Sequence, residues 1–376
     1  MAREHCIAYK VFANRIHDLI NLLKESDETM GEINNAMNDY LGNVERFADF
    51  FNGTMFDGES IVKTEGLDDA SEKYNQSMAF NPRTKERGKT VERIRDLKMK
   101  YNDGVCLRIL GLEGQDYIDY GAGVRGAEYD IMEYRSQMKH LKAGVDNNKE
   151  KLSKSELFSG MRRDDHLNPT YTIWFYYGTE PYDGPKSLSD MMNFPEDDKF
   201  RRYFSDYKLN VICLNDINDM SVFHTELRQL FKLMKCRDSS KAMRQLLEND
   251  TDYNSVKEDT LYTMSVVASN PRLWEEREKY INGDEREVNY NMCLAFDQIE
   301  AEEREKGREE GEEIIRIRLI CKKLARGKEL EEIADDLEEE AEDIRLMYDV
   351  AAGFAPDYNV EDVYRAYRRE MDAVID

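Results

Sequence analysis

The hairpin pattern at Asn102-Asp103-Gly104 is the feature of this 376-residue chain that most restricts its fold. An Asp-Gly pair between two strand-like runs is typical of a two-residue hairpin loop, in which Asn102 pairs with Val105. The second run, residues 105–112, is apolar almost throughout, which is typical of a strand covered on both faces. The sequence therefore predicts an antiparallel strand pair built into the interior of a sheet.

The predicted pairing brings two acidic side chains to one face of the hairpin. With a two-residue loop, Asp96 lies opposite Gly111, and Glu113 lies two residues further along the partner strand. Because side chains alternate along a strand, Asp96 and Glu113 share a face as a diagonal pair, with roughly 7–8 Å between their Cα atoms. Two carboxylates at that spacing can share one Mg²⁺ ion, and Gln115 extends the same face. The alternative is that the pair is solvated and incidental.

Composition limits the class of protein. The chain is long enough for one large domain or two ordinary ones, and it lacks the apolar run of roughly 20 residues that a membrane span requires. Its N-terminus shows no signal-peptide pattern, and its six cysteines are scattered without a CxxC pair. We therefore expect a cytoplasmic protein with reduced cysteines and without a membrane partner, a disulfide framework or a zinc site.

The net charge of −24 argues against nucleic-acid binding as a property of the whole chain, but the charge is unevenly distributed. Acidic residues gather in the tail, for example at residues 300–303 and 338–340, whereas the segment before the hairpin is basic. A basic patch beside a carboxylate pair is compatible with a phosphodiester substrate, and a solvated strand edge is the alternative. The basic residues nearest to the hairpin are the predicted nucleic-acid contacts: Arg93, Arg95, Lys98 and Lys100.

Periodicity along the chain predicts a mixed α/β protein with a helical C-terminal region. Apolar stripes indicate helices over residues 1–36 and from residue 43, and aromatic or β-branched runs indicate strands at 171–177 and 209–214. Strands separated by helices imply a mixed sheet. The predicted segments are an N-terminal helical extension (1–40), a mixed-sheet core (41–236), a helical region packed on the core (237–298), a charged low-complexity helix or linker (299–328) and a small C-terminal helical unit (329–376).

Several passages between residues 41 and 315 match, in order, the motifs of one protein family. Residues 45–52 resemble its opening helix, and Arg95-Asp96, the hairpin and Leu110-Gly111-Leu112-Glu113-Gly114-Gln115 resemble its Arg-Asp … Leu-Gly-Ile-Glu-Asn-Gln signature. Further matching passages are Val124-Arg125, Tyr129-Asp130, Phe175-Tyr176-Tyr177-Gly178, Asp183-Gly184-Pro185, Ser187-Leu188, residues 206–210 and the glycine-punctuated stretch 302–313. The chain thus resembles the Rpn family of recombination-promoting nucleases, also called PD-(D/E)XK nuclease family transposases.

The resemblance implies a restriction-endonuclease-like, PD-(D/E)XK mixed-sheet core. It also implies Mg²⁺- or Mn²⁺-dependent endonuclease cleavage of DNA, associated with recombination or transposition. Carried over by position, Asp96 and Glu113 would ligate the metal, and a carboxylate from the opening helix, either Asp49 or Glu45, would be a further ligand. A metal ion held in this way polarises the scissile phosphate and lowers the pKa of a bound water.

Three further residues receive roles from the resemblance. Gln115 takes the position of the catalytic lysine of the general PD-(D/E)XK pattern and would orient the attacking water by hydrogen bonding, because an amide is not a charged proton acceptor. Arg125 would stabilise the phosphate, and Tyr129 would support the site. The family's Glu-Asn-Gln is Glu113-Gly114-Gln115 here, so Gly114 adds backbone freedom beside the metal ligand.

Two other functions fit the same residues. The first is a DNA-binding or recombination accessory protein on the same fold that has lost cleavage. The second is a structural or interaction protein, in which the acidic tail and the amphipathic helices near either end of the chain assemble partners, including a second copy of the chain. In that case the carboxylate pair would be incidental.

Overall fold

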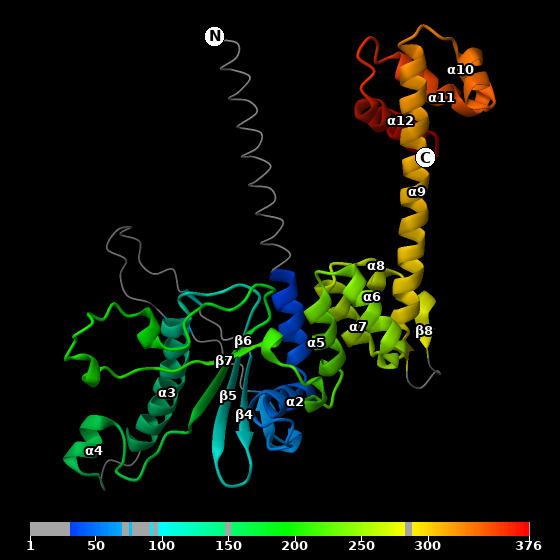
Figure 1. The fold of residues 1–376 in the computed structure, drawn as a ribbon. Coiled ribbons are helices and arrows are strands. Elements are labelled where there is room, and N and C mark those ends of the chain that lie inside the picture. The colour runs from blue at the N-terminus through cyan, green and yellow to red at the C-terminus, as the bar shows by residue number, and fades with distance from the viewer. Residues whose placement is uncertain are drawn as a thin grey trace, which may run out of the picture. The chain divides into compact units, whose positions relative to one another are not determined.

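The computed structural model describes residues 31–69, 75–76, 91–92, 97–146, 152–282 and 288–375. The chain divides into two compact units, Met1–Cys293 and Leu294–Asp376. The first unit contains a five-stranded mixed sheet, and the described residues of the second form helices, which confirms the predicted α/β class with a helical C-terminal region (Figure 1). Among the described residues, no helix combines the length and the apolar character needed to cross a bilayer.

A five-stranded sheet forms the centre of the first unit. Its strands are β1 (Leu67–Asp69), β4 (Leu97–Asn102), β5 (Leu107–Gln115), β6 (Thr170–Tyr176) and β7 (Asn210–Cys213), in the order β1-β4-β5-β6-β7. The pairs β1–β4 and β4–β5 are antiparallel, whereas β5, β6 and β7 run parallel. Parallel neighbours need a long crossover, and α3 (Ala122–Asp146) provides it between β5 and β6. Two short strand pairs, β2 (Asn75–Gln76) with β3 (Val91–Glu92) and β8 (Ile281–Asn282) with β9 (Asn289–Tyr290), lie outside this sheet.

Aromatic packing holds α2 (Val44–Met55) and α5 (Leu227–Cys236) against one face of the sheet. Phe50 of α2 meets Phe175 of β6 edge-on, with ring centroids 4.8 Å apart, and Phe175 lies 5.3 Å from Phe231 of α5. All three rings are fully buried, and burial of one such side chain stabilises the fold by about 1.5–3 kcal/mol. The helix α2 starts directly after its capping residue Asn43, which confirms the predicted start.

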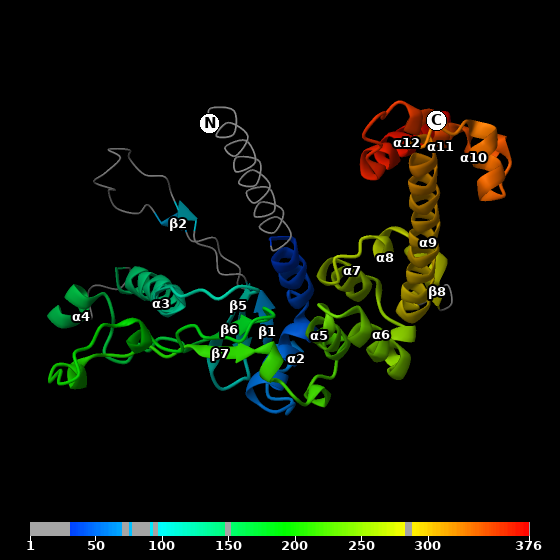
Figure 2. The same ribbon diagram turned by 45° about the horizontal axis from the view of Figure 1, so that its top comes forward.

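Buried polar contacts hold α3 on the side of the sheet away from α2 (Figure 1, Figure 2). The Asp130 carboxylate of α3 accepts hydrogen bonds from the hydroxyl groups of Thr172 and Tyr207, each at 2.7 Å. The Lys98 ammonium group of β4 donates to Glu133 of α3 at 3.0 Å, and both side chains are almost fully buried. Charged groups inside a protein need such partners, because burial of an isolated charge is costly. This face is therefore more polar than the one that α2 covers.

The hairpin between β4 and β5 has a four-residue loop, residues 103–106, so the predicted two-residue loop is wrong. The register shifts accordingly, and Lys98 rather than Asp96 lies opposite Gly111. Residues 109–115 of β5 are all buried, so the predicted covered strand is confirmed over residues 109–112. The first part of the predicted run differs, because Val105 lies in the loop and is 93% exposed. Asp96, one of the two carboxylates of the predicted diagonal, lies outside the described residues.

The Asp103 side chain accounts for the longer loop. Its carboxylate accepts hydrogen bonds from the backbone N–H groups of Val105 and Cys106, both at 2.9 Å, and from the Arg108 guanidinium group at 2.6 Å. Gly104 takes a φ of 85°, a conformation that other residues rarely adopt. Hydrogen bonds from an aspartate to nearby backbone groups give the chain an alternative to the tight turn, so the loop opens to four residues.

We expect Asp103 to stay ionised to unusually low pH. Hydrogen bonds from the Cys106 and Val105 backbones and from Arg108 lower its pKa from 3.8 to about 2. Because the folded-state pKa is the lower one, the carboxylate stabilises the loop above pH 3.8, and this contribution is lost as the pH falls through about 2. An NMR titration of the carboxyl carbon should therefore give a midpoint near pH 2, which Arg108→Ala should raise. A midpoint at the ordinary value would contradict this loop geometry.

The chain after β7 is mainly helical over its described residues, as predicted. The glycine-punctuated stretch 302–313 lies inside one continuous helix, α9 (Met292–Leu324). In the second unit, the end of α9 and the three helices that follow share a core that includes Ile317, Ile333 and Val363. Residues 294–376 contain 26 acidic and 13 basic residues, so they hold more than half of the net charge of −24. The remaining α-helices are α4 (Lys154–Ser159), α6 (Ser240–Asn249), α7 (Glu258–Val267), α8 (Arg272–Glu275), α10 (Leu330–Leu337), α11 (Ala341–Ala352) and α12 (Val360–Ile375).

Candidate active site

Glu113 is a buried acidic residue near the end of β5. Its side chain is only 1% exposed, and its neighbour across the parallel pairing with β6 is Trp174. The guanidinium group of Arg125, near the start of α3, lies 3.8 Å from the Oε2 atom of Glu113. A carboxylate removed from water needs such a partner, because its desolvation is otherwise uncompensated. The fold therefore brings together two of the residues that the sequence singled out.

Arg125 is held in place by more than Glu113. Its Nη1 atom lies 2.9 Å from the Asp119 carboxylate, and its guanidinium group packs over the Trp174 ring at 4.8 Å from the centroid. Burial alone would lower the pKa of Arg125, but a hydrogen bond with Tyr117 and the electrostatic effects of Tyr129 and the two carboxylates raise it. Arg125 is therefore a fixed positive charge beside Glu113. Tyr129, the predicted supporting residue, is close enough to Arg125 to affect its pKa.

Several polar atoms around Glu113 are buried without a partner. Among the described residues, eight buried side-chain nitrogen or oxygen atoms lack a hydrogen-bond partner. Three of the eight are near Glu113, namely Gln115 Oε1, Arg125 Nε and Trp174 Nε1, and a fourth, Asp116 Oδ1, directly follows β5. Burial also raises the pKa of Asp116, against the opposing effect of hydrogen bonds and of a nearby arginine. Native proteins rarely bury unpaired polar atoms, so a cluster of them indicates a place for water, an ion or a ligand.

Asp49, one of the two predicted ligands from the opening helix, forms hydrogen bonds to the segment before α5. Its carboxylate accepts hydrogen bonds from the backbone N–H of His224, at 2.9 and 3.0 Å to its two oxygens. The backbone N–H and the hydroxyl group of Thr225 also donate to it, at 2.8 and 2.6 Å. These contacts fasten α2 to the segment that leads into α5. Both oxygens of Asp49 already accept hydrogen bonds, so it is less suited than Glu45 to the predicted role of metal ligand.

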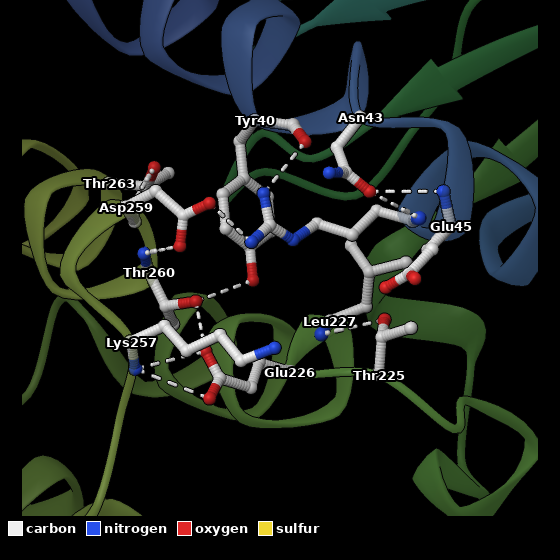
Figure 3. Close-up of polar contacts among 11 residues, drawn as sticks. Tyr40, Asn43, Glu45, Thr225, Glu226, Leu227, Lys257, Asp259, Thr260 and Thr263 are labelled. Atoms are coloured by element: carbon white, nitrogen blue, oxygen red, sulfur yellow. Dashed lines mark hydrogen bonds and ion pairs between the residues drawn. The ribbon is translucent and has the colours of Figure 1, made fainter. Parts of the chain in front are cut away.

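Glu45 lies one helical turn before Asp49, in the first turn of α2. Its carboxylate is exposed, and Figure 3 draws no hydrogen bond or ion pair to it among the residues shown, whereas its backbone N–H donates to the Asn43 side chain. The chain just before α2 approaches β4, since a Cβ atom at Gly42 would lie 3.7 Å from Leu97. Of the two predicted opening-helix carboxylates, Glu45 is therefore the one that remains available, on a helix end that adjoins the start of β4.

A separate polar network beside the start of α2 joins this helix to α7 (Figure 3). The hydroxyl groups of Tyr40 and Thr260 share a hydrogen bond of 2.9 Å, and Thr260 also donates to the Glu226 carboxylate. Arg46 donates to Asp259 and packs over the Tyr40 ring, 3.9 Å from its centroid. Burial raises the pKa of Tyr40 well above its usual value, so its phenol stays protonated. These contacts are within the protein and position α2.

The predicted basic contacts are described only in part. The residues of the predicted site that lie outside the described chain are Arg93, Arg95 and Asp96. Lys98 is buried, and its ammonium group is held by Glu133, which does not fit its predicted role as an exposed nucleic-acid contact. The period-two alternation of β4 explains this, since Lys98 faces the covering helix α3. Lys100, two residues further along the same face, is exposed.

Two contributors to the site were missed by the sequence analysis. Trp174 lies in a predicted strand, but only the parallel register of β5 with β6 places it beside Glu113. Asp119 precedes α3, and its Oδ1 atom accepts the backbone N–H of Gly121 at 2.7 Å. This hydrogen bond to the N–H two residues on forms an Asx turn, which an Asp-x-Gly sequence before a helix indicates, so Asp119 could have been found from the sequence. No local sequence pattern indicated that Trp174 would lie beside Glu113.

Among the described residues, no group of three or more His, Cys, Asp or Glu side chains is placed to hold a metal ion. Comparisons of the chain with protein-family models, with curated proteins and with solved structures found no match in any of the three. What is known of the site is therefore its own geometry: a buried carboxylate, an adjacent fixed cation and several unpaired polar atoms at the end of a central strand.

Proposed function

We propose that the chain is a Mg²⁺- or Mn²⁺-dependent DNA endonuclease with a PD-(D/E)XK-like core, acting in recombination or transposition. The observation that carries the proposal is Glu113, which is 1% exposed at the end of a central strand and lies 3.8 Å from Arg125. A buried acid beside a cation, with unpaired polar atoms around it, is a typical setting for catalysis. The mixed sheet and its helical crossover are compatible with a restriction-endonuclease-like core.

The oxygen atoms at this place suit Mg²⁺, which prefers oxygen ligands and usually binds through one or two carboxylates. Glu113 offers a carboxylate, and Gln115 Oε1 is a buried amide oxygen without a hydrogen-bond partner among the described residues. Asp96 is proposed as the second carboxylate because it directly precedes Leu97, which pairs with Leu112, the residue before Glu113. A shared ion would compensate the negative charges of the two carboxylates.

Glu45 is the proposed further ligand from the opening helix. Its carboxylate is exposed, and it belongs to the end of α2 that adjoins β4. Asp49 is less suited to this role, because its oxygens already accept four hydrogen bonds from His224 and Thr225. The donor set proposed here is therefore Asp96, Glu113 and Glu45.

The chain's own residues would bind and orient the reacting groups. Mg²⁺, when bound, supplies polarisation of the phosphate and a more acidic water. Arg125 is a fixed cation that can neutralise charge on the phosphate oxygens, and its packing over Trp174 limits the positions of its guanidinium group. Gln115 can orient a water molecule through its unpaired amide oxygen. Because Glu113 lies away from bulk water, each electrostatic interaction in the site is stronger than at an exposed position.

Metal titration and plasmid nicking test the proposal together. The wild-type protein should bind Mg²⁺ or Mn²⁺ in a calorimeter and should convert supercoiled plasmid to the open-circular form only when the metal is present. In Asp96→Ala both metal binding and nicking should be lost, while the circular dichroism spectrum stays unchanged. A wild-type protein that neither binds the metal nor nicks DNA would contradict the proposal.

A second candidate is a DNA-binding or recombination accessory protein that does not cleave. Two observations favour it: Arg125 already bridges Glu113 and Asp119, and the described residues contain no group of three metal-ligating side chains. For this function the same experiments would give DNA binding that weakens with salt, without metal-dependent nicking.

A further inference from the structure

A pocket lies between β4, the start of β5 and the C-terminal half of α3, and we call it the β4–α3 pocket. Its volume is about 340 Å³. Its walls include Lys98 and Lys100 from β4, His140 from α3, and His166 and Asn168 from the segment before β6. Small-molecule pockets in proteins have volumes from about 300 Å³ upward, so this one suits a ligand of the size of a single nucleotide.

The wall of the β4–α3 pocket is basic, although the chain as a whole is acidic. Among the described residues that line it, Glu133 is the one acid, and the Lys98 ammonium group lies 3.0 Å from its carboxylate. Lys100 then remains as a lining cation without an acidic partner in the pocket wall, and the imidazole groups of His140 and His166 offer ring N–H donors. The balance of charge favours an anionic ligand.

Hydrogen bonds fix one part of the pocket wall, around Lys98, Glu133 and Gln137. The side chains of Lys98 and Glu133 are each 7% exposed, so this ion pair is part of the interior. Gln137 donates to Glu133 at 3.2 Å, and its Oε1 atom accepts the backbone N–H of Asn168 at 2.7 Å. Polar groups that are already ordered bind a ligand without the further loss of conformational entropy that flexible ones would suffer.

We propose that the β4–α3 pocket binds a phosphomonoester group. A terminal phosphate accepts hydrogen bonds from lysine and histidine donors, and the apolar lining residues Leu107, Ile109 and Leu141 can contact an attached sugar or base. The source of the phosphate is a free mononucleotide or the 5′ end of a DNA strand. Only the second source rests on the proposed nuclease function.

Calorimetric titration of the full chain with adenosine 5′-monophosphate tests the proposal, with adenosine as the ligand that lacks the phosphate. The nucleotide should bind at least about tenfold more tightly than the nucleoside, because hydrogen bonds to a charged group are among the stronger ones. Lys100→Ala and His166→Ala should each weaken nucleotide binding by about tenfold. Both side chains are exposed, so we expect the fold to survive, whereas replacement of Lys98 would break a buried ion pair.

Lys139→Ala is the matched control, since it removes an exposed lysine of α3 that does not line the pocket. This variant should bind the nucleotide as the wild type does. Glu113→Gln should also retain nucleotide binding even where cleavage is lost, which separates failure of this proposal from failure of the proposed nuclease function. Equal affinities for nucleotide and nucleoside, or an equal loss in Lys100→Ala and Lys139→Ala, would overturn the proposal.

Short DNA strands with and without a 5′-phosphate distinguish the two sources. At least about fivefold tighter binding of the phosphorylated strand, lost in Lys100→Ala, supports recognition of a strand end. Equal binding of the two strands, with nucleotide binding retained, supports a free nucleotide as the ligand. Either result supports phosphomonoester binding at the β4–α3 pocket.

Discussion

Glu113→Gln should reduce Mg²⁺-dependent nicking by at least about 100-fold, because removal of one electrostatic group from a preorganised site has effects of that order. The substitution preserves the size of the side chain and removes its charge. Arg125 keeps the Asp119 carboxylate as a partner at 2.9 Å, so we expect the fold to survive. The rate of supercoil conversion at saturating Mg²⁺ measures the effect, and thermal unfolding followed by circular dichroism reports the fold.

Glu180→Gln is the matched control for this substitution. Glu180 is an exposed residue after β6, so the same chemical change there should leave nicking at the wild-type rate. Wild-type cleavage by Glu113→Gln would show that the site has been assigned to the wrong residue. Equal losses in the two variants would show that the effect is not specific to the buried carboxylate.

Asp49→Ala should lower the free energy of unfolding by about 2–4 kcal/mol, because it removes a buried charged acceptor and leaves its donors unpaired. The backbone N–H groups of His224 and Thr225 and the Thr225 hydroxyl group all donate to this carboxylate. Without it, the connection between α2 and the segment before α5 loses its polar contacts. Urea unfolding monitored by tryptophan fluorescence would measure the change.

Glu45→Ala provides the comparison within the same helix. Glu45 is exposed, so its replacement should change the free energy of unfolding by no more than about 0.5 kcal/mol. Because Glu45 is the proposed metal ligand, the same variant should also weaken Mg²⁺ binding. An Asp49→Ala variant with wild-type stability and no metal binding would reverse the two assignments and restore Asp49 as the ligand.

Local patterns in the sequence were sufficient for the elements of the core. The helix after Asn43, the covered part of β5 at residues 109–112 and the strand that contains Trp174 were each predicted from periodicity and residue type. The register of the hairpin was not, because one aspartate, Asp103, forms hydrogen bonds that favour a longer loop over the common two-residue turn. A difference of two residues in a loop moved every pairing along the two strands.

The candidate site was predictable to a smaller extent. The burial of Glu113 followed from the apolar run around it, but its surroundings depend on a parallel pairing between strands that are distant in the sequence. The choice between Asp49 and Glu45 was undecidable from the sequence, since it depends on where residues 224–225 pack. The burial of Lys98 depended on α3, which supplies its partner Glu133. The surroundings of Glu113, the contacts of Asp49 and the burial of Lys98 all depend on tertiary contacts, which local sequence patterns do not reveal.

Because the chain divides into two units, its isoelectric point of about 4.8 does not describe each unit separately. Residues 294–376 hold 26 acidic and 13 basic residues, so this short helical unit sets most of the acidity that the whole chain displays. Isoelectric focusing and retention on an anion-exchange column would therefore follow the helical unit more closely than the sheet that carries Glu113 and the β4–α3 pocket. Bulk acidity is consequently a poor guide to which ligands the larger unit attracts.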